Sequence, residues 1–156
     1  MSPGPKGLIV TADDFGIAPE VNEAVMRAHR DGILTCASLM VAAPAAADAL
    51  ARAKTMPNLG VGLHLVLVEG KPVLPPSQIP ALVGADGNFR TDMVKASFGM
   101  FFRPKVRRQL AAEIEAQFAA FASTGLPLDH VNAHKHFHLH PTIGRLAFDI
   151  GKRYGM

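Results

Sequence analysis

Short apolar runs alternate with longer segments of helical periodicity along most of this chain. Apolar runs of strand length predict buried strands at residues 8–10, 38–41, 59–65 and 128–131. Apolar positions at helical spacing predict helices that begin at Pro19, Ala45, Pro104 and Ile143. The resulting order βαβαβαβα predicts an α/β fold in which helices lie outside a parallel sheet.

Residues 69–104 break this rhythm. Four prolines and the turn sequence at residues 86–88 indicate loop structure. The segment is too long for an ordinary connection, which favours a lid or a substrate-facing insertion within one domain spanning residues 1–156. We expect at least two of the aromatic residues Phe98, Phe101 and Phe102 to pack against the rest of the domain and so anchor this segment to it.

Composition narrows the class of protein. The chain has 156 residues, of which 49% are hydrophobic and 19% charged, as is typical of a globular domain. A net charge of only +3 with dispersed basic residues argues against a nucleic-acid partner. No apolar stretch approaches the ~20 residues of a membrane span, and we expect a cytoplasmic protein without a transmembrane segment. The single cysteine, Cys36, cannot form an internal disulfide and is expected to be a buried thiol.

Four of the seven histidines alternate with other residues at positions 134, 136, 138 and 140. In an extended chain this alternation would place all four imidazoles on one face. A metal-scavenging tract or a solvated turn are the alternatives. The four rings cannot all bind one ion together with ligands from elsewhere. We therefore expect one ligand, one or two groups that contact substrate, and one bystander.

Three polar motifs follow predicted strands: Asp13-Asp14-Phe15-Gly16, His64 and the histidine cluster. The carboxyl ends of parallel strands carry the active site in α/β folds. Two imidazoles and a carboxylate leave open positions on a divalent ion, while a second carboxylate can serve as general base. Adjacent side chains of a strand face opposite ways, so both aspartates reach one site only where the chain turns, for which Gly16 supplies flexibility.

Simpler structural explanations exist for each motif taken alone. An Asp-Asp pair is more often a turn or a helix cap. His64 by itself would be a hydrogen-bonded core histidine, and His130 a buried or outer-shell residue. The placement of all three motifs at one edge of the sheet favours the functional interpretation.

The motifs at residues 11–16, 62–65 and 134–141 resemble those of the YdjC-like carbohydrate deacetylases. The likeness extends through residues 18–25, 31–35 and 126–133, and within the family it is strongest to the hopanoid-biosynthesis-associated HpnK proteins. It implies a (β/α) barrel hydrolase that removes N-acetyl groups from amino sugars with one divalent ion, magnesium or zinc. Residue by residue it implies a base, Asp13; three metal ligands, Asp14, His64 and His134; a second catalytic group, His138; and two substrate contacts, His136 and Phe15.

The division of roles between Asp13 and Asp14 can also be the reverse. Members of that family are longer than this chain, and four βα units make about half of such a barrel. An unpaired sheet edge would favour self-association, so a homo-oligomer is expected. A catalytically incomplete metal- or carbohydrate-binding remnant is the alternative. A metal-dependent phosphohydrolase ranks last, because the chain has no Gly-rich phosphate loop.

Overall fold

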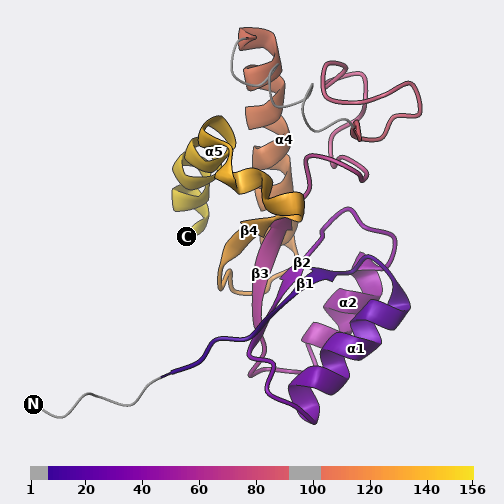
Figure 1. Ribbon diagram of the computed structural model, residues 1–156, viewed down its shortest axis with the longest axis vertical. Coiled ribbons are helices and arrows are strands. Elements are labelled where there is room, and N and C mark those ends of the chain that lie inside the picture. The colour runs from indigo at the N-terminus through magenta and orange to yellow at the C-terminus, as the bar shows by residue number, and fades with distance from the viewer. Residues whose placement is uncertain (1–6, 92–102) are drawn as a thin grey trace, which may run out of the picture.

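The computed structural model describes residues 7–91 and 103–156, in which four parallel strands form one sheet in the order β1-β2-β3-β4. The strands are β1 (Thr11–Phe15), β2 (Cys36–Leu39), β3 (Gly60–Leu65) and β4 (Val131–Ala133). The helices are α1 (Pro19–Arg30), α2 (Ala46–Ala53), α4 (Pro104–Ser123) and α5 (Pro141–Gly151), with short 3-10 segments η1 (His134–Leu139) and η2 (Lys152–Tyr154). The predicted α/β fold with about half of a parallel barrel is confirmed (Figure 1).

The first predicted strand is misplaced. Leu8 and Ile9 are 74% and 79% exposed, and the strand begins only at Thr11, which pairs with Cys36 of β2. Three of the five residues of β1, TADDF, are polar, so an apolar run could not mark it. The second and fourth strands are also shifted by a few residues, whereas β3 agrees with the prediction to within one residue.

The apolar side chains of the sheet face the helices. The predicted stripe of α4 is buried as expected: Val106, Leu110, Ile114, Phe118 and Phe121. On the sheet, the buried residues Ala37, Leu39, Leu63 and Leu65 alternate with Cys36, Ser38, Gly62 and His64, which therefore lie on the opposite face. Figure 1 shows α1 and α2 together beside β1 and β2, and α4 and α5 together beside β3 and β4. Within the described residues, no helix is both long and apolar enough to cross a membrane.

Helix α4 also fastens the start of the insertion. The side-chain amide of Gln117 bonds the backbone of Val66 in both directions, at 2.9 and 2.7 Å. The Glu113 carboxylate accepts hydrogen bonds from the backbone N–H groups of Val73 and Leu74, at 2.9 and 3.0 Å. Burial raises the pKa of Glu113 even though these donors favour its charged form. The predicted anchors Phe98, Phe101 and Phe102 lie outside the described residues.

Candidate metal and active site

A bulge in β1 brings the two adjacent aspartates to the same site. Ala12 pairs with Ala37 and Phe15 with Leu39, so residues 13 and 14 lie opposite residue 38 alone. Asp14 has a φ of 59°, in the left-handed region that aspartate tolerates better than most residues. A bulge of this kind redirects side chains next to functional sites. The chain does turn here, as expected, but the turn lies at Asp14 within the strand and not only at Gly16 beyond it.

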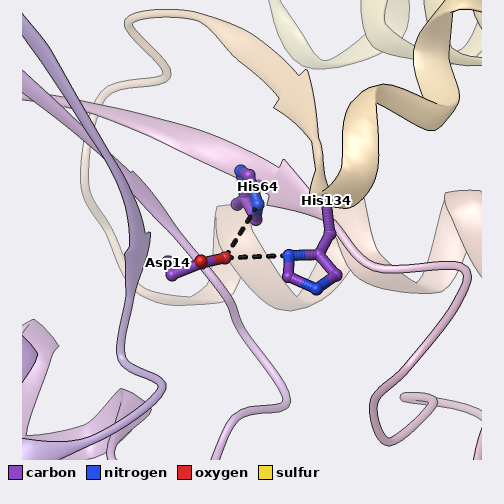
Figure 2. A group of neighbouring side chains, drawn as sticks. All are labelled: Asp14, His64 and His134. Atoms are coloured by element: carbon purple, nitrogen blue, oxygen red, sulfur yellow. Dashed lines mark hydrogen bonds and ion pairs between the residues drawn. The ribbon is translucent and has the colours of Figure 1, made fainter.

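Asp14, His64 and His134 meet at the carboxyl end of the sheet (Figure 2). Oδ1 of Asp14 lies 3.1 Å from Nε2 of His64 and 2.9 Å from Nδ1 of His134. One ligand atom from each residue lies within 4.8 Å of the others. The structure thus brings together the three residues that the family resemblance implies as metal ligands, from β1, β3 and the start of η1.

The hydrogen bonds of Asn132 determine the tautomer of His64. The Asp13 carboxylate can only accept, so Nδ2 of Asn132 donates to its Oδ1 at 2.7 Å. The Asn132 oxygen therefore accepts from Nδ1 of His64, also at 2.7 Å. This leaves a lone pair on Nε2, a buried atom that has no hydrogen-bond partner among the described residues. That lone pair faces the carboxylate of Asp14, and two acceptors so close together fit a cation between them.

Burial lowers the pKa of His64 from its ordinary value, because charging the ring within the protein is costly. Hydrogen bonding to Asn132 and the charges of Asp13 and Asp14 oppose this shift without reversing it. The imidazole is consequently held in the neutral form that binds metal ions.

Asp13 lies beside the three candidate ligands. Its Oδ1 accepts hydrogen bonds from Asn132 at 2.7 Å and from the buried hydroxyl of Ser38 at 3.3 Å, and lies 3.9 Å from Nδ1 of His64. These donors orient the carboxylate. Sequence reasoning did not single out Asn132 or Ser38. The spacing of Asn132, two residues before His134, was a usable signal, but its register pairing with His64 was not readable from the sequence.

The histidine cluster is not extended beyond its first member. Strand β4 ends before His134, and Lys135 and His136 have φ values of 53° and 55°. These left-handed conformations turn the chain into η1, so period-two alternation does not apply here. The tract is therefore not extended, and the condition under which all four rings would share one face is not met.

The other histidines of the cluster and Phe15 lie outside the group of ligand atoms around Asp14. His136 is exposed and contacts the ring of His138 edge to face, with centroids 6.1 Å apart. Neither belongs to the group of ligand atoms around Asp14, although Nδ1 of His138 is buried without a hydrogen bond among the described residues. The ring of His140 accepts from the backbone N–H of Thr142 and caps α5. Phe15 is completely buried in the core, so the substrate contact expected of it is not available.

A hollow of about 380 Å³ lies at the same end of the sheet. It is bounded by residues that follow the first three strands and by the insertion, among them Ile17, Met40, Val66, Glu69 and Phe89. The backbone N–H of Ile17 bonds the carbonyl oxygen of Asp14, which places this rim directly after the bulge. The hollow is at the same end of the sheet as the candidate ligands, but none of those three residues lines it.

Comparison with known proteins finds similar sequences and a similar fold. A carbohydrate deacetylase of Brevibacillus brevis is 37% identical over 150 residues, which are 94% of this chain and 56% of the relative. A carbohydrate deacetylase of Geobacillus stearothermophilus is also 37% identical over 150 residues, 96% of this chain and 58% of the relative. A crystal structure of a proposed cellobiose-phosphate cleavage protein of Enterococcus faecalis superposes with a TM-score of 0.80 and 29% identity.

That superposition covers 94% of this chain and 55% of the solved one. The chain spans a little over half the length of the curated relatives that it matches. The family described as YdjC-like protein matches residues 7–156, which include the bulge, His64 and His134. This chain therefore belongs to the YdjC-like protein family.

Proposed function

We propose that this chain takes part in the hydrolytic removal of N-acetyl groups from amino sugars, with one divalent ion held by Asp14, His64 and His134. The observation that carries the proposal is the buried lone pair of His64 Nε2, 3.1 Å from the Asp14 carboxylate and without a hydrogen bond in the described part of the chain. The carbohydrate deacetylases among the relatives support the choice of reaction.

The side chains of Asp14, His64 and His134 are suitable ligands for a divalent ion that promotes hydrolysis. Two imidazoles and one carboxylate leave coordination positions open, and by ligand preference they favour zinc or another transition ion over magnesium. When bound, the ion supplies Lewis acidity, which polarises a carbonyl oxygen and makes water more acidic.

Asp13 is the proposed general base. Its carboxylate is oriented by Asn132 and Ser38 and lies next to the ligand group, so it can take a proton from water that attacks the acetamide carbonyl. The C–N bond then breaks as the amine nitrogen receives a proton, and acetate leaves. We assign that second transfer to His138, which would pass to the amine the proton that Asp13 took from water; its Nδ1 is buried without a hydrogen bond among the described residues.

The hollow near Ile17 is the proposed sugar site, and His136 is proposed as an additional contact to the substrate. The insertion at 69–104 would cover the bound substrate as a lid. An ion pair of 3.3 Å between Lys135 and Glu69 already links the insertion to the histidine cluster. In its most specific form, the proposal is that the chain acts in hopanoid biosynthesis and that its substrate is a lipid-linked amino sugar.

Acetate release from N-acetylhexosamines and from an N-acetylated glycolipid tests the proposal. We expect zinc-loaded wild-type protein to release acetate, measured by proton NMR. The rate of acetate release should be at least about 100-fold lower in Asp13→Asn, as expected for removal of a general base. Asp13→Asn should still bind the ion, which separates loss of chemistry from loss of metal. Metal binding without acetate release from any of these compounds would favour the non-catalytic remnant.

A further inference from the structure

A second group of potential ligand atoms lies at the opposite end of the strands. One atom each from Cys36, Asp129 and His130 lies within 4.8 Å of the others. Cys36 begins β2, and the other two residues directly precede β4. The group is therefore at the amino end of the sheet, whereas Asp14 and its partners lie at the carboxyl end.

The hydrogen bonds around Ser38 bear on the state of His130. The Ser38 hydroxyl carries one proton and donates it to Asp13 at 3.3 Å. Its oxygen, 2.9 Å from Nε2 of His130, then accepts from that nitrogen. In the neutral ring this leaves a lone pair on Nδ1, which lies 2.9 Å from Oδ2 of Asp129. Nitrogen and carboxylate are thus two facing acceptors, as His64 Nε2 and Asp14 are at the first site.

Glycines in β3 make room for both side chains. A Cβ atom on Gly62 would lie 2.6 Å from the His130 ring, and one on Gly60 would lie 2.8 Å from the Asp129 carboxyl carbon. Such distances are too short for real contacts. The imidazole and the carboxylate can lie over β3 only because these two positions have no side chain.

The third group, Cys36, is buried but lines a hollow. Its Sγ lies 3.0 Å from the Thr11 hydroxyl, which can donate to a thiolate. The hollow has a volume of about 740 Å³ and is also bordered by Asp129 and Gly60, so it adjoins two of the three residues of this group. Thiolate, imidazole and carboxylate together are a donor set typical of zinc and related transition ions.

We propose that Cys36, Asp129 and His130 form a second metal site, which takes a thiophilic transition ion and is separate from the Asp14 site. The ion would lie between the Nδ1 lone pair of His130 and the Asp129 carboxylate, while Nε2–H of His130 remains bonded to Ser38, as the second nitrogen of a metal-bound histidine usually is. Through Ser38 the same ring would also help to fix Asp13. This proposal does not depend on deacetylase activity.

Cobalt(II) alone is the probe, since only a thiolate ligand gives a sulfur-to-cobalt charge-transfer band in the near ultraviolet. Tag-free wild-type protein and the double variant His64→Ala/His134→Ala, which lacks the first site, are titrated without competing thiols. We expect the band in both proteins, saturating at one ion per chain in the double variant. Cys36→Ser should lose the band and keep its circular dichroism. Absence of the band from the folded double variant, or its persistence in Cys36→Ser, would overturn the proposal.

Alkylation of Cys36 provides a second readout. Zinc should slow the reaction in wild-type protein by at least about tenfold, as expected when a ligand sulfur is no longer a free thiolate. Asp129→Asn changes a half-exposed side chain and should abolish that protection without unfolding the chain. Equal alkylation rates with and without zinc in wild-type protein would contradict the site and leave His130 and Asp129 as a hydrogen-bonded pair.

Discussion

The side-chain oxygen of Asn132 lies 2.7 Å from Nδ1 of His64, and this contact determines which ring nitrogen faces Asp14. The same amide donates to Asp13 at 2.7 Å. One neutral side chain therefore orients both a candidate ligand and the candidate base. Its register position directly opposite His64 makes the double contact possible.

Two substitutions at Asn132 separate these roles. Asn132→Leu removes both contacts, and we expect zinc affinity to fall about 10- to 100-fold, the usual effect of losing a partner of a metal-bound histidine. Asn132→Asp keeps an acceptor for His64 but places a second carboxylate beside Asp13. It should retain zinc affinity, while the acid limb of its pH–rate profile moves to higher pH. Calorimetry and acetate release measure the two effects, and an equal loss of zinc affinity in both variants would contradict the assignment.

Metal-free protein should lose stability in acid partly through His64. Its folded pKa is below the value of 6.5 for an unperturbed ring, so between the two values the unfolded chain binds more protons. The free energy of unfolding then rises with pH up to about 6.5 and falls as pH drops below it. Urea unfolding in a chelator at pH 5.5 and 7.5 should show a smaller difference for His64→Gln than for wild type. The exposed control His136→Gln should resemble wild type, and a His64→Gln difference as large as wild type would refute this account.

Gly62→Ala should displace the His130 ring. The new Cβ would lie 2.5 Å from the carbonyl oxygen of His130 and 2.6 Å from the ring. Overpacking of this kind costs about 1–3 kcal/mol of stability, to be measured by chemical denaturation. Gly7→Ala is the matched control, because nothing lies within 4 Å of the added methyl group. If both variants are equally stable, the strand does not need a glycine at position 62.

The sheet has two outer strands in the described part of the chain, β1 and β4. Open strand edges pair readily with other chains, and the exposed Leu8 and Ile9 lie one residue before the start of β1. We therefore predict self-association, visible in sedimentation as a weight-average mass that rises with concentration. A mass equal to one chain over the micromolar range would disprove it.

Much of the site was predictable because position along parallel strands is readable from sequence. The carboxyl-end rule brought Asp14, His64 and His134 to one edge without any knowledge of contacts. The bulge was not predictable, since it depends on the register of β1 against β2. The turn after His134 was missed for a related reason: alternation in sequence implies one face only while the backbone remains extended.

The same limit explains the misplaced first strand. An apolar run marks a strand buried on both faces, but one face of this sheet is polar and hydrogen bonded through Asp13, Ser38 and Asn132. Leu8 and Ile9 are apolar, as residues of a buried strand would be, but β2 pairs with β1 only from Thr11 onward. Pairing with β2, and not hydrophobicity, determines where β1 begins.

Zinc content tests the central claim most directly. It is measured by elemental mass spectrometry on tag-free protein in the Cys36→Ser background, which removes the proposed second site. The account predicts about one ion per chain, retained in Asp13→Asn and lost in both Asp14→Ala and His134→Ala. No stoichiometric metal after zinc is added back, or an ion that persists in Asp14→Ala, would contradict a metal centre built from Asp14, His64 and His134.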